Sequence, residues 1–225
     1  MIVVKRGKEP NSLLKFRKEN PDADYESDMP TDVLKDIREQ MWEEQKCLCA
    51  YCMKKIEAPS VVRIEHCRPR HPQDEQEHDK KATLDFKWML GVCYGNSLVK
   101  GIKQEDTTCD AHRGNTELTV DPFDELSVRK IKYKSDGSIY SDDTEINKDV
   151  TETLNLNCQA LSLPQTRKNV LMAEKNRIMR KCKGKSQEAF MRELERTYAS
   201  FVQERNLTPY CGIIISWLES KLKIS

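Results

Sequence analysis

The sequence predicts a mainly helical α+β protein, with a zinc-braced core near residues 46–125 and a helical C-terminal region. Three observations lead to this prediction. Apolar residues recur at helical spacing near both ends of the chain, Asp136-Gly137 lies between two apolar runs as in a β-hairpin, and two pairs of cysteines occupy the middle. A chain of 225 residues has room for such a core and an added helical part.

The N-terminal segment, residues 1–45, is expected to be an extended lead-in followed by a helix. Prolines at positions 10, 21 and 30 prevent a long helix early in this segment, although Asn11 or Ser12 could cap a short one. Apolar residues then repeat at helical spacing over residues 31–45, which predicts a helix that leads directly to the first cysteines.

The core, residues 46–125, is expected to alternate short elements with polar loops. The β-branched run Val61–Ile64 predicts a strand that continues to His66. The amphipathic segment from Leu84 to Val92 predicts a helix. The remaining expectations are exposed polar loops at residues 71–82 and 97–108, and a short strand at residues 118–120.

The C-terminal part, residues 126–225, is expected to be a hairpin followed by helices. Residues 128–140 form the predicted hairpin, and helices are predicted over residues 144–155, 161–183, 186–204 and 212–223. The shared core of these helices is expected to contain Leu171, Ile178, Phe190, Leu194, Phe201, Ile214, Trp217 and Leu218.

The overall composition indicates a cytoplasmic protein. The first residues lack the pattern of a signal peptide, and no apolar run has the length that spans a membrane. In that setting nine cysteines favour metal binding or buried thiols over disulfides. The chain has 38 Lys and Arg and 37 Asp and Glu, so its net charge is close to zero. Affinity for nucleic acid would therefore have to come from local basic clusters.

The cysteine spacing predicts a structural zinc site. Cys49 and Cys52 have the spacing at which two thiolates bind one zinc ion, and Cys93 with Cys109 would complete a tetrahedral set. Fifteen residues separate the second pair, but the entropic cost of closing a longer loop grows only slowly. Rival ligands are Cys47 and Cys67. The other three cysteines are expected to be buried thiols: Cys158, Cys182 and Cys211.

An acid–histidine pair between the two halves of this zinc site points to catalysis. His66 follows a predicted strand, and its neutral imidazole could take a proton from water. Glu65 and Asp110 offer carboxylate oxygens, which suit Mg²⁺ or Mn²⁺ in phosphate chemistry. Glu65 fits less well, because adjacent residues in a strand point to opposite faces. The alternative is that both acids are ordinary surface charges.

Basic residues beside these groups could contact a phosphate backbone. Arg68, Arg70 and Arg113 are the candidates for phosphate contacts, and His112 is a possible auxiliary metal or phosphate ligand. Solvated surface charge remains an equally good explanation for the arginines.

The order of the cysteine pair, Glu65-His66 and the later cysteines followed by Asp110 resembles the HNH (ββα-metal) nucleases. The resemblance implies His66 as the base, Asp110 as the metal ligand on the helix, and the four paired cysteines as zinc ligands. Two departures stand out: Asp110 replaces an Asn that is common there, and the middle Asn of the HNH signature is absent near Trp88. That Asn normally holds the loop that bears the base, and Asn96 is one candidate to replace it.

Several longer stretches are similar to one HNH family, the PtuB proteins of Septu and retron-associated antiphage defence. They are residues 5–13, 49–53, 85–96 and 144–157, together with Arg167. The resemblance implies a cytoplasmic bacterial endonuclease that works with PtuA, an ATPase of the ABC/SMC type. In retron versions a reverse transcriptase and its small DNA–RNA hybrid (msDNA) join the assembly.

Two alternatives remain open at this point. The substrate could be RNA, for example tRNA, because the same groups hydrolyse both kinds of phosphodiester. The chain could instead be a non-catalytic zinc module that recruits nucleic acid or the ATPase. The Glu65-His66 pair and Asp110 favour the enzyme, because a bare zinc module would not need them.

Overall fold

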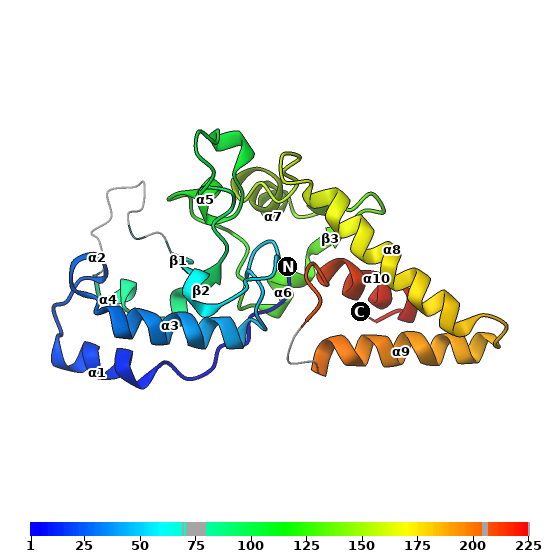
Figure 1. Cartoon of the computed structure of the whole chain (residues 1–225), viewed down its shortest axis with the longest axis horizontal. Helices are drawn as coiled ribbons and strands as arrows, with labels where there is room; N and C mark the ends of the chain where they lie inside the picture. Colours follow the sequence, from blue (N-terminus) through cyan, green and yellow to red (C-terminus); the bar gives the residue numbers. More distant parts are fainter. Residues whose placement is uncertain (69, 71–79, 204–206, 225) are drawn as a thin grey trace.

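The computed structural model describes residues 1–68, 70, 80–203 and 207–224, and it is α+β with about half of the chain in helices (Figure 1). The helices are α1 (Asn11–Glu19), α2 (Tyr25–Asp28), α3 (Thr31–Glu44), α4 (Lys80–Thr83), α5 (Asp110–Arg113), α6 (Glu125–Arg129), α7 (Thr144–Lys148), α8 (Leu163–Cys182), α9 (Gln187–Gln203) and α10 (Gly212–Leu222). The strands are β1 (Arg63–His66), β2 (Met89–Val92), β3 (Ile131–Tyr133) and β4 (Ile139–Ser141). Single helical turns occur at Pro59–Val61, Phe86–Trp88 and Gln104–Asp106, and a π-helical turn at Asp149–Thr153 follows α7.

Helices α1 and α3 cover one side of the hairpin that β1 and β2 form. Helix α3 buries Val33, Ile37 and Met41 on one face, which is the helical spacing that predicted it. Helix α1 adds Leu13 to the same hydrophobic cluster. In Figure 1 these two helices run side by side at the edge opposite α8 and α9.

Strands β1 and β2 form an antiparallel hairpin that carries the predicted catalytic histidine. Glu65 pairs with Leu90 and His66 pairs with Met89. The helix predicted from Leu84 to Val92 is therefore wrong over its second half, which is a strand. All four residues of β2 are buried, and a strand buried on both faces has a continuous apolar run that periodicity cannot distinguish from a short helix.

The strand predicted at residues 118–120 is also absent from the described structure. The backbone N–H groups of Thr119 and Val120 donate to the buried Asp149 carboxylate at 2.7 and 2.8 Å, so this segment pairs with a side chain and not with a strand. The hairpin predicted near Asp136-Gly137 is confirmed as β3 and β4. Most of the polar loop predicted at residues 71–82 lies outside the described residues.

Hydrophobic packing extends across residue 125. One hydrophobic cluster extends from Met1 and Val4 through the first hairpin to Ile146 and Leu156, so the lead-in and the second hairpin belong to the same core as the cysteines. Helices α8, α9 and α10 form a second cluster, which contains the predicted residues Leu171, Ile178, Phe190, Leu194, Phe201, Ile214, Trp217 and Leu218.

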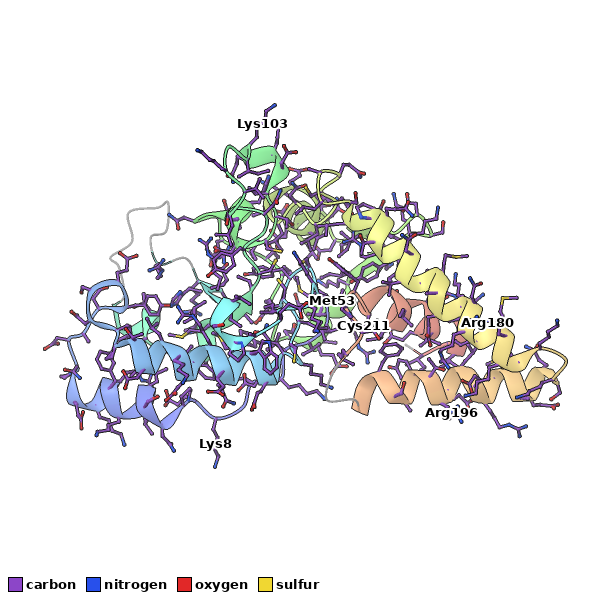
Figure 2. The ribbon with its side chains drawn as sticks, viewed as in Figure 1. Lys8, Met53, Lys103, Arg180, Arg196 and Cys211 are labelled. Atoms are coloured by element: carbon purple, nitrogen blue, oxygen red, sulfur yellow. The ribbon has the colours of Figure 1, made fainter. Side chains whose placement is uncertain are left out.

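The segment from Leu48 to Met53, the cysteine segment, has residues in both hydrophobic clusters and so connects them. Met53 packs in the second cluster with Cys211, and its carbonyl accepts the N–H of Tyr210 at 2.9 Å; Figure 2 labels Met53 and Cys211 at this junction. The helical tail is therefore attached directly to the segment that bears Cys49 and Cys52. Within the described part of the chain, no helix combines the length and the apolar character that a membrane span requires.

Candidate metal centre and the adjoining histidine site

The four predicted zinc ligands converge on one point. The Sγ atoms of Cys49, Cys52, Cys93 and Cys109 all lie within 4.8 Å of one another. Sγ–Sγ distances are 3.8 Å for Cys49–Cys109, 3.7 Å for Cys52–Cys93 and 3.8 Å for Cys93–Cys109. A tetrahedral zinc ion with Zn–S bonds of about 2.3 Å requires sulfur atoms about 3.8 Å apart. These cysteines could therefore hold a structural metal ion such as zinc; the rivals Cys47 and Cys67 are not in the group.

The electrostatics of the cluster also fit a cation. Hydrogen bonding with Cys109, Cys49 and Cys52 holds the pKa of the Cys93 thiol well below its usual value. Burial raises the pKa of Cys109 well above its usual value, with the neighbouring thiols adding to the effect. A bound zinc ion would stabilise the thiolate form of its cysteine ligands.

Close backbone contacts bring the second pair of cysteines together across the intervening loop. Gly95 has a φ of +54°, and a Cβ atom there would lie 1.9 Å from the carbonyl oxygen of Thr108. The N–H of Thr108 donates to the Gly95 carbonyl at 3.0 Å. This contact closes the loop directly beside Cys93 and Cys109, and it requires glycine at position 95.

A residue that the sequence analysis did not single out anchors the same loop. The Asn155 side chain donates to the carbonyls of Glu105 and Thr107 at 2.9 and 2.8 Å. The N–H of Cys109, a residue with a φ of +58°, donates to the carbonyl of Leu154 at 2.9 Å. The segment after α7 thus holds Cys109 in an unfavourable backbone conformation that aims its thiol at the cluster. The only hint in the sequence is an Asn, a residue that tolerates positive φ, after a helix.

His66 lies at the end of β1, buried but beside the predicted metal-binding acids. Its Nε2 atom is 2.9 Å from the carbonyl oxygen of Thr83, and its ring makes a T-shaped contact with the ring of Tyr25 at a centroid distance of 4.5 Å. A carbonyl only accepts, so Nε2 carries the proton and Nδ1 keeps a free electron pair. Among the described residues, Nδ1 has no hydrogen-bond partner. The ring is thus oriented by its Nε2 contact and leaves Nδ1 unprotonated.

The environment of His66 keeps the ring neutral. Burial lowers the pKa of His66 from 6.5 to about 4, against the smaller opposing effect of the Thr83 carbonyl. In the unfolded chain the ring would take up a proton near pH 6.5, so between about pH 4 and 6.5 the unfolded state binds more protons.

We expect this difference to make stability depend on pH. The contribution of neutral His66 is present above about pH 6.5 and is lost as the pH falls towards 4. Wild-type protein should lose on the order of 3 kcal/mol more of its free energy of unfolding over this range than His66→Gln protein. Urea unfolding of both proteins at several pH values measures the difference. Parallel pH profiles would show that His66 is not held neutral by the fold.

Glu65 lies on the other face of β1 in a buried ionic network. Its carboxylate forms an ion pair with Arg113 and accepts a hydrogen bond from the Tyr51 hydroxyl at 3.0 Å. Burial raises the pKa of Glu65 to about 8; Arg113 opposes this effect and Asp110, which is hydrogen-bonded to Glu65, adds to it. Two carboxylates this close together repel each other when both are charged, and a hard cation between them would relieve that repulsion.

Asp110 begins helix α5, directly after the cysteine Cys109. Its side chain is nearly buried and forms an ion pair with Arg63, which shares a face of β1 with Glu65. His66 points to the opposite face, yet the charge of Asp110 still influences its pKa. The hairpin and the short helix thus bring Glu65, His66 and Asp110 into one region, although the two carboxylates and the imidazole do not share a face.

The predicted phosphate contacts differ in exposure. Arg68 is exposed and stacks 3.9 Å above the ring of Trp88, and Arg70 pairs with Glu26 at 2.6 Å. His112 is half-buried, with Nδ1 3.1 Å from the carbonyl of Thr153. Arg113 corrects the expectation, because it is 3% exposed and its guanidinium contacts only groups inside the protein. It cannot reach a phosphate at the surface.

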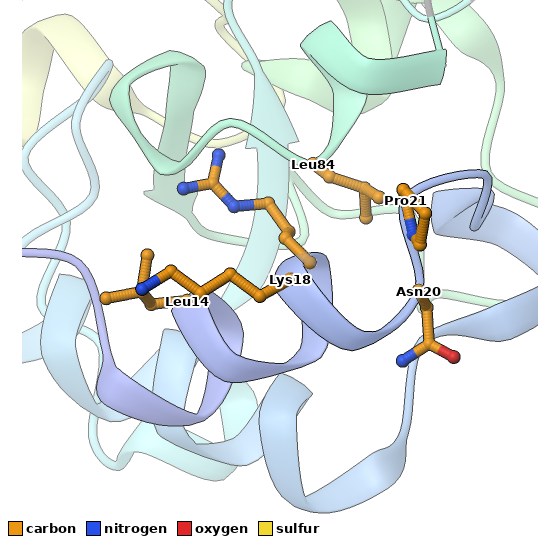
Figure 3. Close-up of a pocket in the computed structure, with 6 residues that line it drawn as sticks. Leu14, Lys18, Asn20, Pro21 and Leu84 are labelled. Carbon is orange, nitrogen blue, oxygen red and sulfur yellow. The ribbon is translucent and has the colours of Figure 1, made fainter.

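A separate pocket of about 350 Å³ lies at the C-terminal end of α1 (Figure 3). It is lined by Leu14, Arg17, Lys18, Asn20, Pro21 and Leu84. None of the predicted site residues lines it, so we assign no chemistry to this pocket.

Comparison with models of protein families and with curated proteins finds no match for this chain.

Proposed function

We propose that the chain is a metal-dependent endonuclease of the HNH type. The observation that carries the proposal is the arrangement of β1, β2 and α5 around the cysteine cluster. His66 ends the first strand, Asp110 begins the helix, and Cys93 and Cys109 join both to the segment of Cys49 and Cys52. A purely structural zinc module would not need an oriented neutral imidazole and two buried carboxylates in the same region.

Each group of the proposed site has a separate chemical role. Nδ1 of His66 takes a proton from the attacking water, because Nε2 is committed to the Thr83 carbonyl. Asp110 and Glu65 would hold Mg²⁺ or Mn²⁺, which when bound stabilises charge on the scissile phosphate and on the departing 3′-oxygen. The four cysteines would hold zinc, which braces the strand and helix and takes no part in the chemistry. Exposed Arg68 is the best placed of the arginines to contact a phosphate backbone.

Replacing Asp110 tests the metal assignment. Asp110→Asn should retain zinc but lower cleavage of DNA or RNA by on the order of 10²-fold, with partial recovery at high Mn²⁺, because an amide is a poorer ligand for a hard cation. Asp142→Asn, which changes an exposed acid on the second hairpin, is the matched control and should cleave normally. Equal cleavage by both variants at low Mg²⁺ would remove Asp110 from the metal site.

The resemblance to PtuB leads to a proposal about the biological role of the chain and its partners. The chain would be the toxic effector of a Septu or retron antiphage system and would act with a PtuA-type ATPase, joined in retron versions by the reverse transcriptase and its msDNA. Helix α8 offers a surface for such a partner. Met172 and Met179 are 46% and 65% exposed on it, next to a hollow of about 400 Å³ lined in part by Asn176 and Arg180. Figure 2 labels Arg180 on this helix.

Acidic substitutions on this face test its role. The double variant Met172→Glu/Met179→Glu should retain zinc but lose copurification with the ATPase, because two charges would be buried in the interface. Leu126→Glu is the control, since Leu126 is 74% exposed on α6. If the double variant copurifies at full occupancy, the partner binds elsewhere.

A further inference from the structure

We propose that Arg113 is a positioning residue that clamps the end of β1 and thereby aims His66. This inference rests on the proposed function for its catalytic consequence, but the clamp itself is a statement about geometry. It gives a buried residue a role that neither phosphate binding nor metal ligation supplies.

The first observation is where the guanidinium donates. Nη1 of Arg113 donates to the carbonyl oxygen of His66 at 2.9 Å, and Nη2 donates to the carbonyl oxygen of Cys67 at 2.7 Å. These are the backbone carbonyls of the base and of the next residue. The N–H of Cys67 donates to the carbonyl of Trp88 at 2.8 Å, so the chain is held from both sides immediately after His66.

The second observation is what holds Arg113. Its Nε donates to the carbonyl of Thr116 at 2.7 Å, and Nη1 also contacts the Tyr51 hydroxyl at 3.3 Å and the Glu65 carboxylate. Tyr51 lies between Cys49 and Cys52, and it is fully buried. The guanidinium therefore ties together the cysteine segment, the end of the histidine strand and the helix that begins with Asp110.

Arginine is the side chain that this geometry requires. Its planar fork presents several N–H donors in fixed directions, whereas lysine offers a single point charge on a flexible stem. Burying the charged guanidinium costs desolvation free energy. Only hydrogen-bond acceptors placed for each of its N–H groups offset that cost. The network is thus suited to holding a particular backbone geometry.

The consequence for His66 follows from its own contacts. The ring is held at Nε2 by the Thr83 carbonyl, and its backbone is held by Arg113. Because the ring and the backbone of His66 are both held, its Nδ1 atom keeps one direction relative to Asp110 and the attacking water. Misplacement of a catalytic group by about 1 Å can cost on the order of 10²-fold in rate.

The test compares two buried arginines. Arg113→Lys keeps the charge and removes the fork, and Arg167→Lys is the matched control. Arg167 is 1% exposed and donates to the Gly137 carbonyl at 2.6 Å and to Asn157 at 2.9 Å, in the helical tail. Two quantities are measured on the full chain: kcat and KM for cleavage, and the ¹⁵N signals of the His66 ring, which report its tautomer.

Arg113→Lys should bind about one zinc per chain and lower kcat by about 10- to 100-fold, with KM nearly unchanged. Its ring signals should show both tautomers, whereas wild-type and Arg167→Lys protein show one tautomer with the proton on Nε2. Unchanged ring signals in Arg113→Lys protein would overturn the clamp, whatever happens to kcat. An equal loss of kcat in Arg167→Lys protein would also overturn it, because the effect would then be general destabilisation.

The two proposals can fail separately. If wild-type protein cleaves no nucleic acid, the proposed function is wrong, and the ring signals alone decide whether Arg113 aims His66. If Arg113→Lys protein does not fold, the NMR signals of the Arg113 guanidinium are recorded in wild-type protein instead. The clamp predicts separate, slowly exchanging Nη1 and Nη2 signals for Arg113, and a single averaged signal would overturn it.

Discussion

If the proposed function holds, cleavage should disappear when His66 is replaced by alanine, while zinc content and binding of the proposed PtuA-type ATPase stay at wild-type levels. The reason is that His66 is the proposed base, with an unprotonated Nδ1 and a ring held by the Nε2 contact with Thr83. Loss of a positioned base typically costs on the order of 10²–10⁴-fold in rate. Single-turnover cleavage of DNA and RNA by both proteins measures the effect.

The pH dependence of the same assay adds a second check. Because burial lowers the pKa of His66 to about 4, wild-type cleavage should not fall as the pH drops through 6.5, where an ordinary histidine would take up a proton. A wild-type rate in His66→Ala protein would mean that another group is the base or that His66 is structural.

Replacing Cys49 with serine should remove the metal and with it the fold of the cysteine region. Three remaining thiols cannot complete the tetrahedral set, and structural zinc contributes folding free energy directly. The loss should extend further, because Ala50 and Met53 of the same segment pack in the two different hydrophobic clusters. We expect insoluble protein, or soluble protein with a much lower melting temperature and no zinc.

Cys182→Ser provides the control for this variant. Cys182 is half-buried at the end of α8 and lies outside the cluster, so its replacement should leave about one zinc per chain. Elemental analysis and thermal unfolding of both variants separate loss of metal from loss of a thiol outside the cluster. A Cys49→Ser protein with wild-type zinc content and melting temperature would show that the cluster is not a metal site.

The cysteine quartet could be predicted from the sequence because its chemistry restricts the choices. The short spacing of Cys49 and Cys52 predicts one half of a zinc site, whereas the spacing of the second pair left Cys47 and Cys67 as rivals until the structure excluded them from the group. The amphipathic helices of the tail were equally readable, since the apolar positions of residues 187–203 repeat along one face.

Other features depend on tertiary contacts that leave little trace in the sequence. Arg113 was expected at the surface, because its acceptors are mostly backbone carbonyls brought together by folding. The anchoring role of Asn155 likewise depends on carbonyls some fifty residues earlier in the chain. The second strand was mistaken for a helix because it is buried on both faces.

The most direct test of the account is to incubate the wild-type chain, alone and with the proposed PtuA-type ATPase, with DNA and with total RNA in the presence of Mg²⁺. We predict cleavage products with 5′-phosphate and 3′-hydroxyl ends, since the metal held by Asp110 and Glu65 would stabilise the departing 3′-oxygen. Cleavage should stop when Mg²⁺ is withdrawn, while the zinc remains bound. Intact DNA and RNA, in a preparation that contains stoichiometric zinc and bound ATPase, would contradict the nuclease and leave a zinc-braced binding module in its place.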